Sequence, residues 1–329
     1  MINTDLVVIK IATRLEQFEL KEPFISAQHT IREKTVLIIQ ITDQNGNIVA
    51  SECPVFETPG YTEETIEIAK EVIINQISPL ICNQKIKLNQ LSVLFEPLVH
   101  LYPFSCAAIE IGIWQLIAKQ ENTTLTKLWE TQKQCLREGV VIGKQETYEA
   151  YKNKINEAVQ KKVNRIKLKW DSQMDIILLT KLRKIVPNRV QFAIDLNQSL
   201  ADEKKGMGLA RWVDFIEQPY PKGELKKTAM LQAKLAIPIC LDESISSVSM
   251  LDKVIGLKAA RMINIKPTRV GGASIAIAMM KRCHQYNIKC FIGGMLESPL
   301  GRDIVRVLAT RNEITEPSDV VDVSWYIKS

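Results

Sequence analysis

The chain has 329 residues, of which 46% are hydrophobic and 24% are charged, and its formal net charge is +6. This balance excludes a disordered or fibrous protein, and no RNA- or DNA-binding module is recognisable, so we expect no nucleic-acid partner. The seven cysteines are scattered without a C-x-x-C pair, no uncharged apolar stretch could cross a bilayer, and no signal peptide is recognisable. We therefore expect a cytoplasmic protein without a membrane partner, and the sequence leaves a homo-oligomer open.

The first part of the sequence predicts a small α+β domain. Residues 35–42 are rich in β-forming side chains and are followed by the turn signal Asp-Gln-Asn-Gly-Asn at 43–47. Thr62 is a suitable N-cap for a helix with glutamates in its first turn, and a second helix is expected to begin at Ser105. We assign residues 1–125 to this α+β domain, which would cap a larger one.

From about residue 138 the pattern changes to short apolar β-runs separated by helical patterns. The runs start roughly 23 to 27 residues apart, which is the length of a parallel β/α unit. With a candidate eighth strand near 319–324, they fit a TIM-type (β/α) barrel, in a modified (β/α)7β form, better than a doubly wound sheet of similar periodicity. We therefore expect residues 126–329 to form the barrel. The runs are 139–143, 165–170, 190–197, 213–219, 238–244, 262–267 and 289–296.

Five of these strands end in polar side chains that a barrel core would not hold without a reason. Residues two apart on a strand point to the same side, so the first four of them form two pairs. The C-terminal ends of barrel strands surround the active-site mouth, and three carboxylates should therefore converge there with lysines on each side. In chain order these residues are Lys167 and Lys169, Asp195 and Asn197, Glu217, Asp242 and Lys266.

Converging carboxylates and paired lysines have a predictable chemistry. Three carboxylates repel one another and hold protons unless a cation neutralises them. Because the set contains no histidine or thiolate, it favours a hard cation, Mg²⁺ before Ca²⁺ or Mn²⁺, with Asn197 supporting the site beside Asp195. Lys167 and Lys169 disfavour each other's protonated form, and a lysine whose pKa moves from about 10.4 toward about 7 to 8 becomes a usable general base.

The strand-end residues belong to a larger set of short sequence stretches that together are characteristic of one protein family. They are Ser51-Glu52-Cys53, 61–65 and 107–110 in the first part, and 167–169, 195–197, Glu217-Gln218-Pro219, 242–244, 264–272 and 293–298 in the barrel. In combination, and over nearly the whole chain, they resemble the enolase superfamily in its muconate-lactonizing-enzyme-like subgroup. The closest resemblance is to the o-succinylbenzoate synthase / N-acylamino acid racemase family.

The resemblance implies a magnesium-dependent carbon–oxygen lyase of menaquinone biosynthesis that acts on a small-molecule carboxylate. Such an enzyme removes an α-proton and completes a syn dehydration of a cyclohexadiene carboxylate, and Mn²⁺ is expected to substitute for Mg²⁺. Asp195, Glu217 and Asp242 look like the three metal ligands. The loop 52–61 and the segment around Phe24 look like elements that close over the substrate.

The resemblance also assigns the three lysines and leaves a second activity open. Lys169 looks like the general base and acid, tuned by Lys167. Lys266 looks like the lysine on the opposite face of the substrate, which stabilises the intermediate in a synthase and is the second base in a racemase. Racemisation of an N-acylamino acid, such as an N-succinylamino acid, is therefore the alternative, and the sequence supports both equally.

A third alternative is a non-catalytic relative with a shortened C-terminus. Members of the family that the chain resembles usually continue, after the candidate last strand at 320–324, with a further segment that returns toward the capping domain, and we expect this segment to be absent here, since the sequence ends at Ser329. Against an inert protein stands the free-energy cost of keeping a polar cluster buried without a use. A dipeptide epimerase is disfavoured because that group carries a D-x-D motif where this chain has Gly294-Met295-Leu296.

Overall fold

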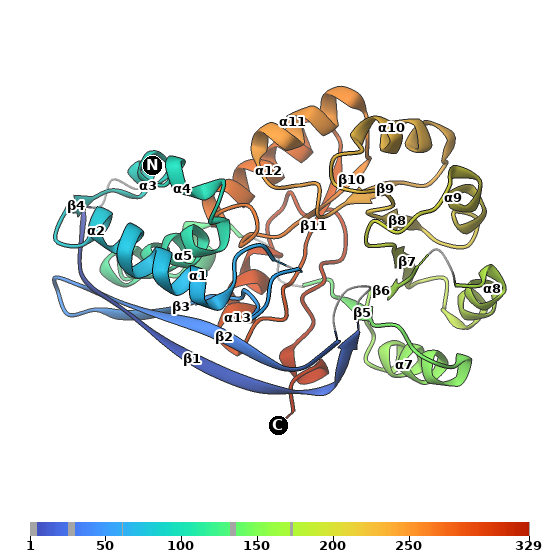
Figure 1. Cartoon of the computed structure of the whole chain (residues 1–329), viewed down its shortest axis with the longest axis horizontal. Helices are drawn as coiled ribbons and strands as arrows, with labels where there is room; N and C mark the ends of the chain where they lie inside the picture. The colour runs from blue at the N-terminus through green and yellow to red at the C-terminus, as the bar shows by residue number, and fades with distance from the viewer. Residues whose placement is uncertain (1–4, 26–29, 61, 132–135, 172–173, 329) are drawn as a thin grey trace.

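The computed structural model describes residues 5–25, 30–60, 62–131, 136–171 and 174–328. It contains a four-stranded antiparallel sheet of order β3-β2-β1-β4 and a curled seven-stranded sheet in which β5 to β11 follow one another (Figure 1). The predicted fold class, an α+β cap with a TIM-like barrel, is confirmed. We propose to keep the boundary between the two parts at residue 125. In the described part of the chain, no helix is both long and apolar enough to span a membrane.

The antiparallel sheet contains the predicted hairpin. The turn between β2 and β3 is closed by the carboxylate of Asp43, which accepts hydrogen bonds from the N–H groups of Asn45 and Asn47. Gly46 has a φ of 79°, a conformation that glycine adopts without steric cost. The strands are β1 (Leu6–Ile25), β2 (Thr30–Asp43), β3 (Ile48–Cys53) and β4 (Lys85–Ile86).

The helices of the N-terminal part cover one face of this sheet, and α5 packs along β2 and β3. The N-cap of α1 is Thr65, whose hydroxyl accepts a backbone N–H. The prediction that Thr62 caps this helix is wrong, because its hydroxyl donates to the carbonyl of Glu64. The helix predicted from Ser105 begins at Pro103, which the first turn of a helix tolerates. The helical segments are α1 (Ile66–Glu71), a π-helix (Val72–Ile77), α2 (Ser78–Ile81), a 3-10 helix (Leu88–Gln90), α3 (Leu91–Leu94), α4 (Glu96–Val99), α5 (Pro103–Gln120) and α6 (Leu125–Leu128).

In the barrel, parallel strands alternate with helices that lie outside the curled sheet (Figure 1). The strands are β5 (Gly139–Ile142), β6 (Arg165–Lys169), β7 (Gln191–Asp195), β8 (Phe215–Glu217), β9 (Ile239–Leu241), β10 (Met262–Ile265) and β11 (Lys289–Ile292). The helices are α7 (Tyr148–Gln160), α8 (Ile176–Ile185), α9 (Glu203–Leu209), α10 (Leu225–Lys234), α11 (Val248–Leu257), α12 (Ala273–Gln285) and α13 (Pro299–Leu308). This arrangement brings the carboxyl ends of all seven strands to one end of the sheet.

The eighth position of the barrel is filled by a shorter segment than predicted. Ser318 forms a parallel bridge with Glu138 at the start of β5, and Asp319 forms one with Gly293 after β11. The predicted strand at 319–324 does not continue, because residues 323–325 form a 3-10 helix. Two residues therefore link the edges of the curled sheet.

The residues after this segment return to the N-terminal part. Ile327 forms an antiparallel bridge with Leu20, and the N–H of Lys21 donates to the carbonyl of Tyr326 at 2.8 Å. Residues 326–328 therefore contact the end of β1 in the N-terminal part.

Two buried glutamates join the N-terminal part to barrel helices. Glu52, on β3, accepts hydrogen bonds from the N–H groups of Ser298 at 3.0 Å and Gly301 at 3.1 Å, where α13 begins. Glu110, on α5, accepts one from the N–H of Ala273 at 2.8 Å, where α12 begins. The first N–H groups of a helix have no partner within it, so each carboxylate caps a helix end and also ties the two parts together.

The Glu52 contact predicts a pH-dependent stability. Burial raises the pKa of Glu52 to about 7, although the hydrogen bonds from Ser298 oppose the shift. Between the unfolded value of about 4.3 and 7, the folded state binds more protons, so this group's contribution to stability falls as pH rises. Glu52→Gln cannot titrate. Between pH 4.5 and 7.5, the unfolding free energy of Glu52→Gln minus that of the wild type should therefore increase by up to about 3 kcal/mol. Urea unfolding at each pH measures this difference.

The matched control is Glu67→Gln, which changes an exposed glutamate in the first turn of α1. Its unfolding free energy should follow that of the wild type across the same pH range. A difference between wild type and Glu52→Gln that stays constant with pH would contradict the assignment.

Candidate functional site

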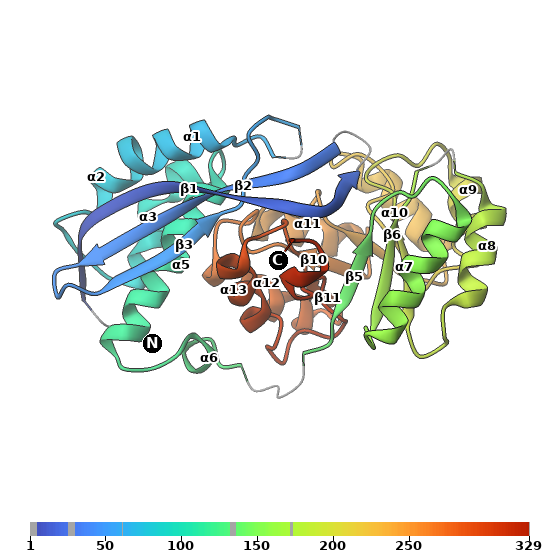
Figure 2. The same ribbon diagram turned by 90° about the horizontal axis from the view of Figure 1, so that it is seen from below.

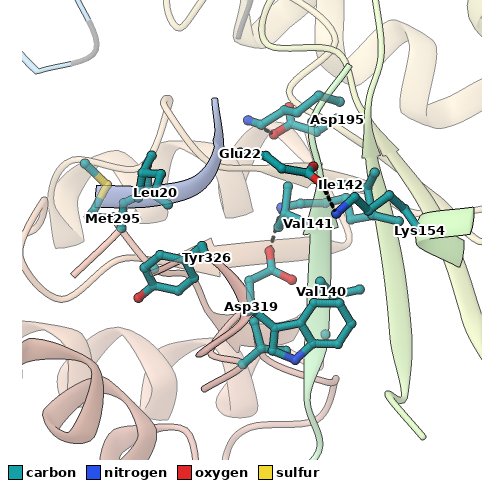
Figure 3. Close-up of a pocket in the computed structure, with 18 of the residues that line it drawn as sticks. Leu20, Glu22, Val140, Val141, Ile142, Lys154, Asp195, Met295, Asp319 and Tyr326 are labelled. Carbon is teal, nitrogen blue, oxygen red and sulfur yellow. Dashed lines mark hydrogen bonds and ion pairs between the residues drawn. The ribbon is translucent and has the colours of Figure 1, made fainter. Parts of the chain in front are cut away.

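The carboxyl ends of the parallel strands open into a cavity of about 370 Å³ (Figure 3). Side chains at the ends of β6 to β10 form one side of it. Residues 20–23 at the end of β1 and the C-terminal Trp325 and Tyr326 form another. β1 reaches this place because β1 and β2 cross the molecule and β1 ends beside β5 and α7 (Figure 2). The cavity is therefore built from both parts of the chain.

The structure brings all six predicted metal-binding and catalytic side chains to this cavity. Strand register explains their proximity, because Lys169 lies beside Asp195 on the next strand and Asp195 lies beside Glu217. Asn197, the predicted supporting residue, accepts a hydrogen bond from Lys169 Nζ at 3.0 Å and donates to Glu243 at 3.0 Å. The six side chains are Lys167, Lys169, Asp195, Glu217, Asp242 and Lys266.

Each of the three carboxylates is paired with a buried ammonium group. The pairs and their N–O distances are Lys169–Asp195 at 2.7 Å, Lys167–Glu217 at 2.7 Å and Lys266–Asp242 at 2.9 Å. Arg269 also binds Asp242, on its other oxygen. Buried charges are stable only when such partners neutralise them, so the sign of the charge alternates around the cavity.

The carboxylates differ in how strongly they hold a proton. Burial raises the pKa of Glu217 to about 7, and the charges of Asp195 and Asp242 add to this shift although Lys167 opposes it. Burial acts on Asp242 too, but nearby cations, above all Arg269, outweigh it and hold the pKa of Asp242 well below its usual range. The acidic side chains are thus close enough to affect one another's ionisation.

The environment of Lys167 differs from the sequence-based expectation. Burial alone would lower the pKa of Lys167, but the charges of Asp319 and Glu217 outweigh it and hold that pKa well above its usual value. Its ammonium lies 2.6 Å from Asp319 Oδ2 and 2.7 Å from Glu217. Lys167 therefore keeps its proton despite the neighbouring Lys169, because two carboxylates contact it directly.

The donor set can be tested for its fit to a divalent cation. Among the described residues, no three side chains of Asp, Glu, His or Cys are close enough together to hold a metal ion. The three carboxylates instead contact their lysine partners. Yet the buried oxygens Glu243 Oε2 and Asn264 Oδ1 accept no hydrogen bond. Mutual repulsion also raises the pKa of Glu217. Buried carboxylate and amide oxygens that lack a hydrogen-bond donor, beside carboxylates that repel one another, fit a hard divalent ion.

Two residues of the site were missed by the sequence analysis. Asp319 binds Lys167 on one oxygen and Arg165 at 2.6 Å on the other. The strand-end rule did not select it, because Asp319 is the first and not the last residue of the candidate eighth strand. Asn264 donates to Glu217 at 3.0 Å. A Cβ on Gly293 would collide with the side-chain amide of Asn264, so any larger residue there would displace Asn264.

Only part of the sequence that is predicted to close over the substrate lies at the cavity in the structure. Among the described residues of the N-terminal part, 20–23 line the cavity and 52–60 do not. Tyr61 and the side chain of Phe24 lie outside the described part of the chain.

Comparison with known proteins gives the same picture. The family described as "Enolase C-terminal domain-like" matches residues 150–324, and the N-terminal domain of mandelate racemase / muconate lactonizing enzyme matches residues 8–129. A solved structure of an enolase-superfamily member from Listeria innocua superposes with a TM-score of 0.93 and 30% identity, covering 98% of this chain and 88% of that chain.

Curated relatives extend the similarity to named enzymes. The chain is 32% identical to the o-succinylbenzoate synthase of Listeria innocua, over 92% of this chain and 82% of that protein. It is 30% identical to the N-succinylamino acid racemase of Thermus thermophilus, over 95% of this chain and 85% of that protein.

The ion pairs of Asp319 predict a large effect on stability. Asp319→Ala leaves the buried Arg165 and Lys167 without this counter-charge, and breaking a buried pair from one side costs about 3–5 kcal/mol. The unfolding free energy from urea titration should fall by this amount. Asp303→Ala, which changes an exposed residue of α13, should lie within about 0.5 kcal/mol of the wild type. A loss below about 1 kcal/mol for Asp319→Ala would show that the two cations find other partners.

Proposed function

The chain belongs to the mandelate racemase / muconate lactonizing enzyme family of the enolase superfamily, and on this basis we propose that it is an o-succinylbenzoate synthase. This enzyme is a carbon–oxygen lyase that dehydrates a cyclohexadiene carboxylate. The observation that carries the proposal is the alternating ring of carboxylates and lysines at the ends of β6 to β10, in one cavity. The similarity to curated synthases over nearly the whole chain supports the same activity.

The cofactor follows from the superfamily, whose members generally use Mg²⁺. We assign its binding to Asp195, Glu217 and Asp242, and we expect Mn²⁺ to take its place. When bound, the divalent ion would stabilise the second negative charge that develops on a carboxylate as its α-proton leaves. This assignment rests on the adjacent strand positions of the three carboxylates and on the fit of their donor atoms to a hard ion.

The three lysines have different roles in this reaction. Lys169 in its neutral form takes the α-proton from carbon, and the same group then donates that proton to the departing hydroxyl, so that water leaves. Asn197 and Asp195 hold the Lys169 amine in position through the hydrogen bonds described above. Lys167 stays protonated and orients Glu217. Lys266 directly follows β10, on the other side of the carboxylate-bearing strands, and supplies positive charge there.

Racemisation of N-succinylamino acids is the second candidate activity. It requires a base on each side of the substrate. Lys169 at the end of β6 and Lys266 just after β10 flank the three strands that carry the carboxylates. The relative from Thermus thermophilus bears this activity in its name.

We further propose a cytoplasmic location, which the free cysteines of the described residues support.

Removal of either base should separate the two halves of the reaction. With an N-succinylamino acid in D₂O, Lys169→Ala should lower deuterium incorporation from one enantiomer by about 10²- to 10⁴-fold, because general-base catalysis contributes this factor. Lys266→Ala should do the same for the other enantiomer. NMR integration of the α-proton measures both. The exposed Lys181→Ala is the control. Undiminished exchange in Lys169→Ala would refute its role.

The metal assignment predicts one Mg²⁺ site per chain by isothermal titration calorimetry. Glu217→Gln removes a charged ligand and should weaken Mg²⁺ binding by at least about 10-fold, whereas Glu146→Gln, at an exposed position, should not. If the wild type takes up no Mg²⁺ at millimolar concentration, the chain is better explained as a non-catalytic relative.

A further inference from the structure

The cavity carries a second set of charged side chains, separate from the ring at the strand ends. Lys21 and Glu22 come from β1, and Lys154 and Glu157 come from α7. The Glu22 and Glu157 side chains are 53% and 43% exposed and that of Lys154 is 30% exposed, whereas every lysine and carboxylate of the inner ring is at most 8% exposed. The second set therefore lies at the solvent side of the cavity. We call these four residues the mouth cluster.

Lys154 is the cation of the mouth cluster that the structure holds in place. Its ammonium lies 2.6 Å from Glu22 Oε1 and 3.9 Å from Glu157 Oε2 (Figure 3). The contact to Glu22 joins α7 of the barrel to β1 of the N-terminal part. The half-buried ammonium of Lys154 is therefore in direct contact with a carboxylate from another element, that of Glu22.

The remaining cation of the cavity outside the inner ring is committed elsewhere. Arg302 lies 2.8 Å from Glu297 Oε2, donates to the hydroxyl of Tyr326 and donates to the carbonyl of Asp319 at 3.0 Å. A ligand would have to break several short contacts to reach it. Among the described lining residues this leaves Lys154 and the more exposed Lys21 for an anionic ligand.

Apolar side chains also line the cavity, beside the mouth cluster and the inner ring. Ile142 of β5 lies next to the Glu22–Lys154 pair, and Leu20, Met295 and Tyr326 line the cavity nearby (Figure 3). A ligand that fits this distribution has an apolar body and a negative group at each end. One negative group would lie at the inner ring and the other at the mouth.

Resting on the function proposed above, we propose that Lys154 binds the distal carboxylate of the succinyl side chain. The names of the synthase and racemase relatives share this succinyl group. A terminal carboxylate entering the mouth replaces Glu22 on the Lys154 ammonium, so one charged contact is exchanged for another of the same kind. Glu22 therefore acts as a carboxylate that occupies the subsite until the ligand arrives, and Lys154 determines the preference for succinylated ligands.

Equilibrium binding tests this assignment without requiring turnover. The two probes are o-succinylbenzoate and 2-butanoylbenzoate, which differ by a carboxylate in place of a methyl group, titrated into the Mg²⁺-supplemented protein. Lys154→Met keeps an apolar chain but loses the charge, and it should weaken o-succinylbenzoate binding by about 10- to 100-fold, as expected for a charge-assisted hydrogen bond. Binding of 2-butanoylbenzoate should change by less than about twofold. Glu22→Gln, which removes the competing carboxylate, should tighten binding of o-succinylbenzoate alone.

Controls separate this assignment from its alternatives. Lys152→Met, on the same helix but paired with Glu149 outside the cavity, should bind both probes as the wild type does. An equal effect of Lys154→Met on both probes, or no effect, overturns the assignment, as does transfer of the selective loss to Lys21→Met. A wild type that binds the probes equally, or binds neither, overturns it too. If the preference is present but the purified protein dehydrates no substrate, the proposed synthase activity fails and the subsite stands.

Discussion

The structure depends on the pairing of buried charges at the carboxyl ends of the barrel strands. A charged group taken out of water costs several kcal/mol unless a partner of opposite sign lies against it. Lys169–Asp195 meets this condition because β6 and β7 are in register, and Lys167 meets it by reaching from β6 past Ala193 of β7 to Glu217 of β8. The arrangement that stabilises the folded state is the same one that concentrates reactive groups in the cavity.

The two parts of the chain are held together by carboxylates as well. The side chains of Glu52 and Glu110, in the N-terminal part, cap the N-terminal ends of two barrel helices. The free N–H groups and the helix dipole favour negative charge there. These contacts fix β1 relative to the barrel, and the end of β1 brings Leu20 and Glu22 to the cavity. Glu52 and Glu110 therefore have a structural role and do not line the cavity.

Local periodicity was enough to predict much of the fold and the site. Strand spacing gave the barrel, and the rule that residues two apart share a side placed Lys167 and Lys169 in one cavity. What failed depended on contacts between distant segments. Thr65 and not Thr62 caps α1, because the hydroxyl of Thr62 donates to the carbonyl of Glu64. Asp319 was not predicted as a site residue, because only two residues form the eighth position of the barrel. No local pattern identifies such partners.

The pair of lysines shows why sequence proximity is a poor guide to ionisation. Lys167 and Lys169 repel each other, but carboxylates from other strands contact both, and a direct ion pair outweighs a more distant like charge. Lys167 is bound by Glu217 and Asp319 and keeps its proton, whereas Lys169 shares its hydrogen bonds between a carboxylate and the neutral amide of Asn197. The two lysines are therefore not interchangeable, and this difference in partners supports our proposal that Lys169, at the strand end, is the base.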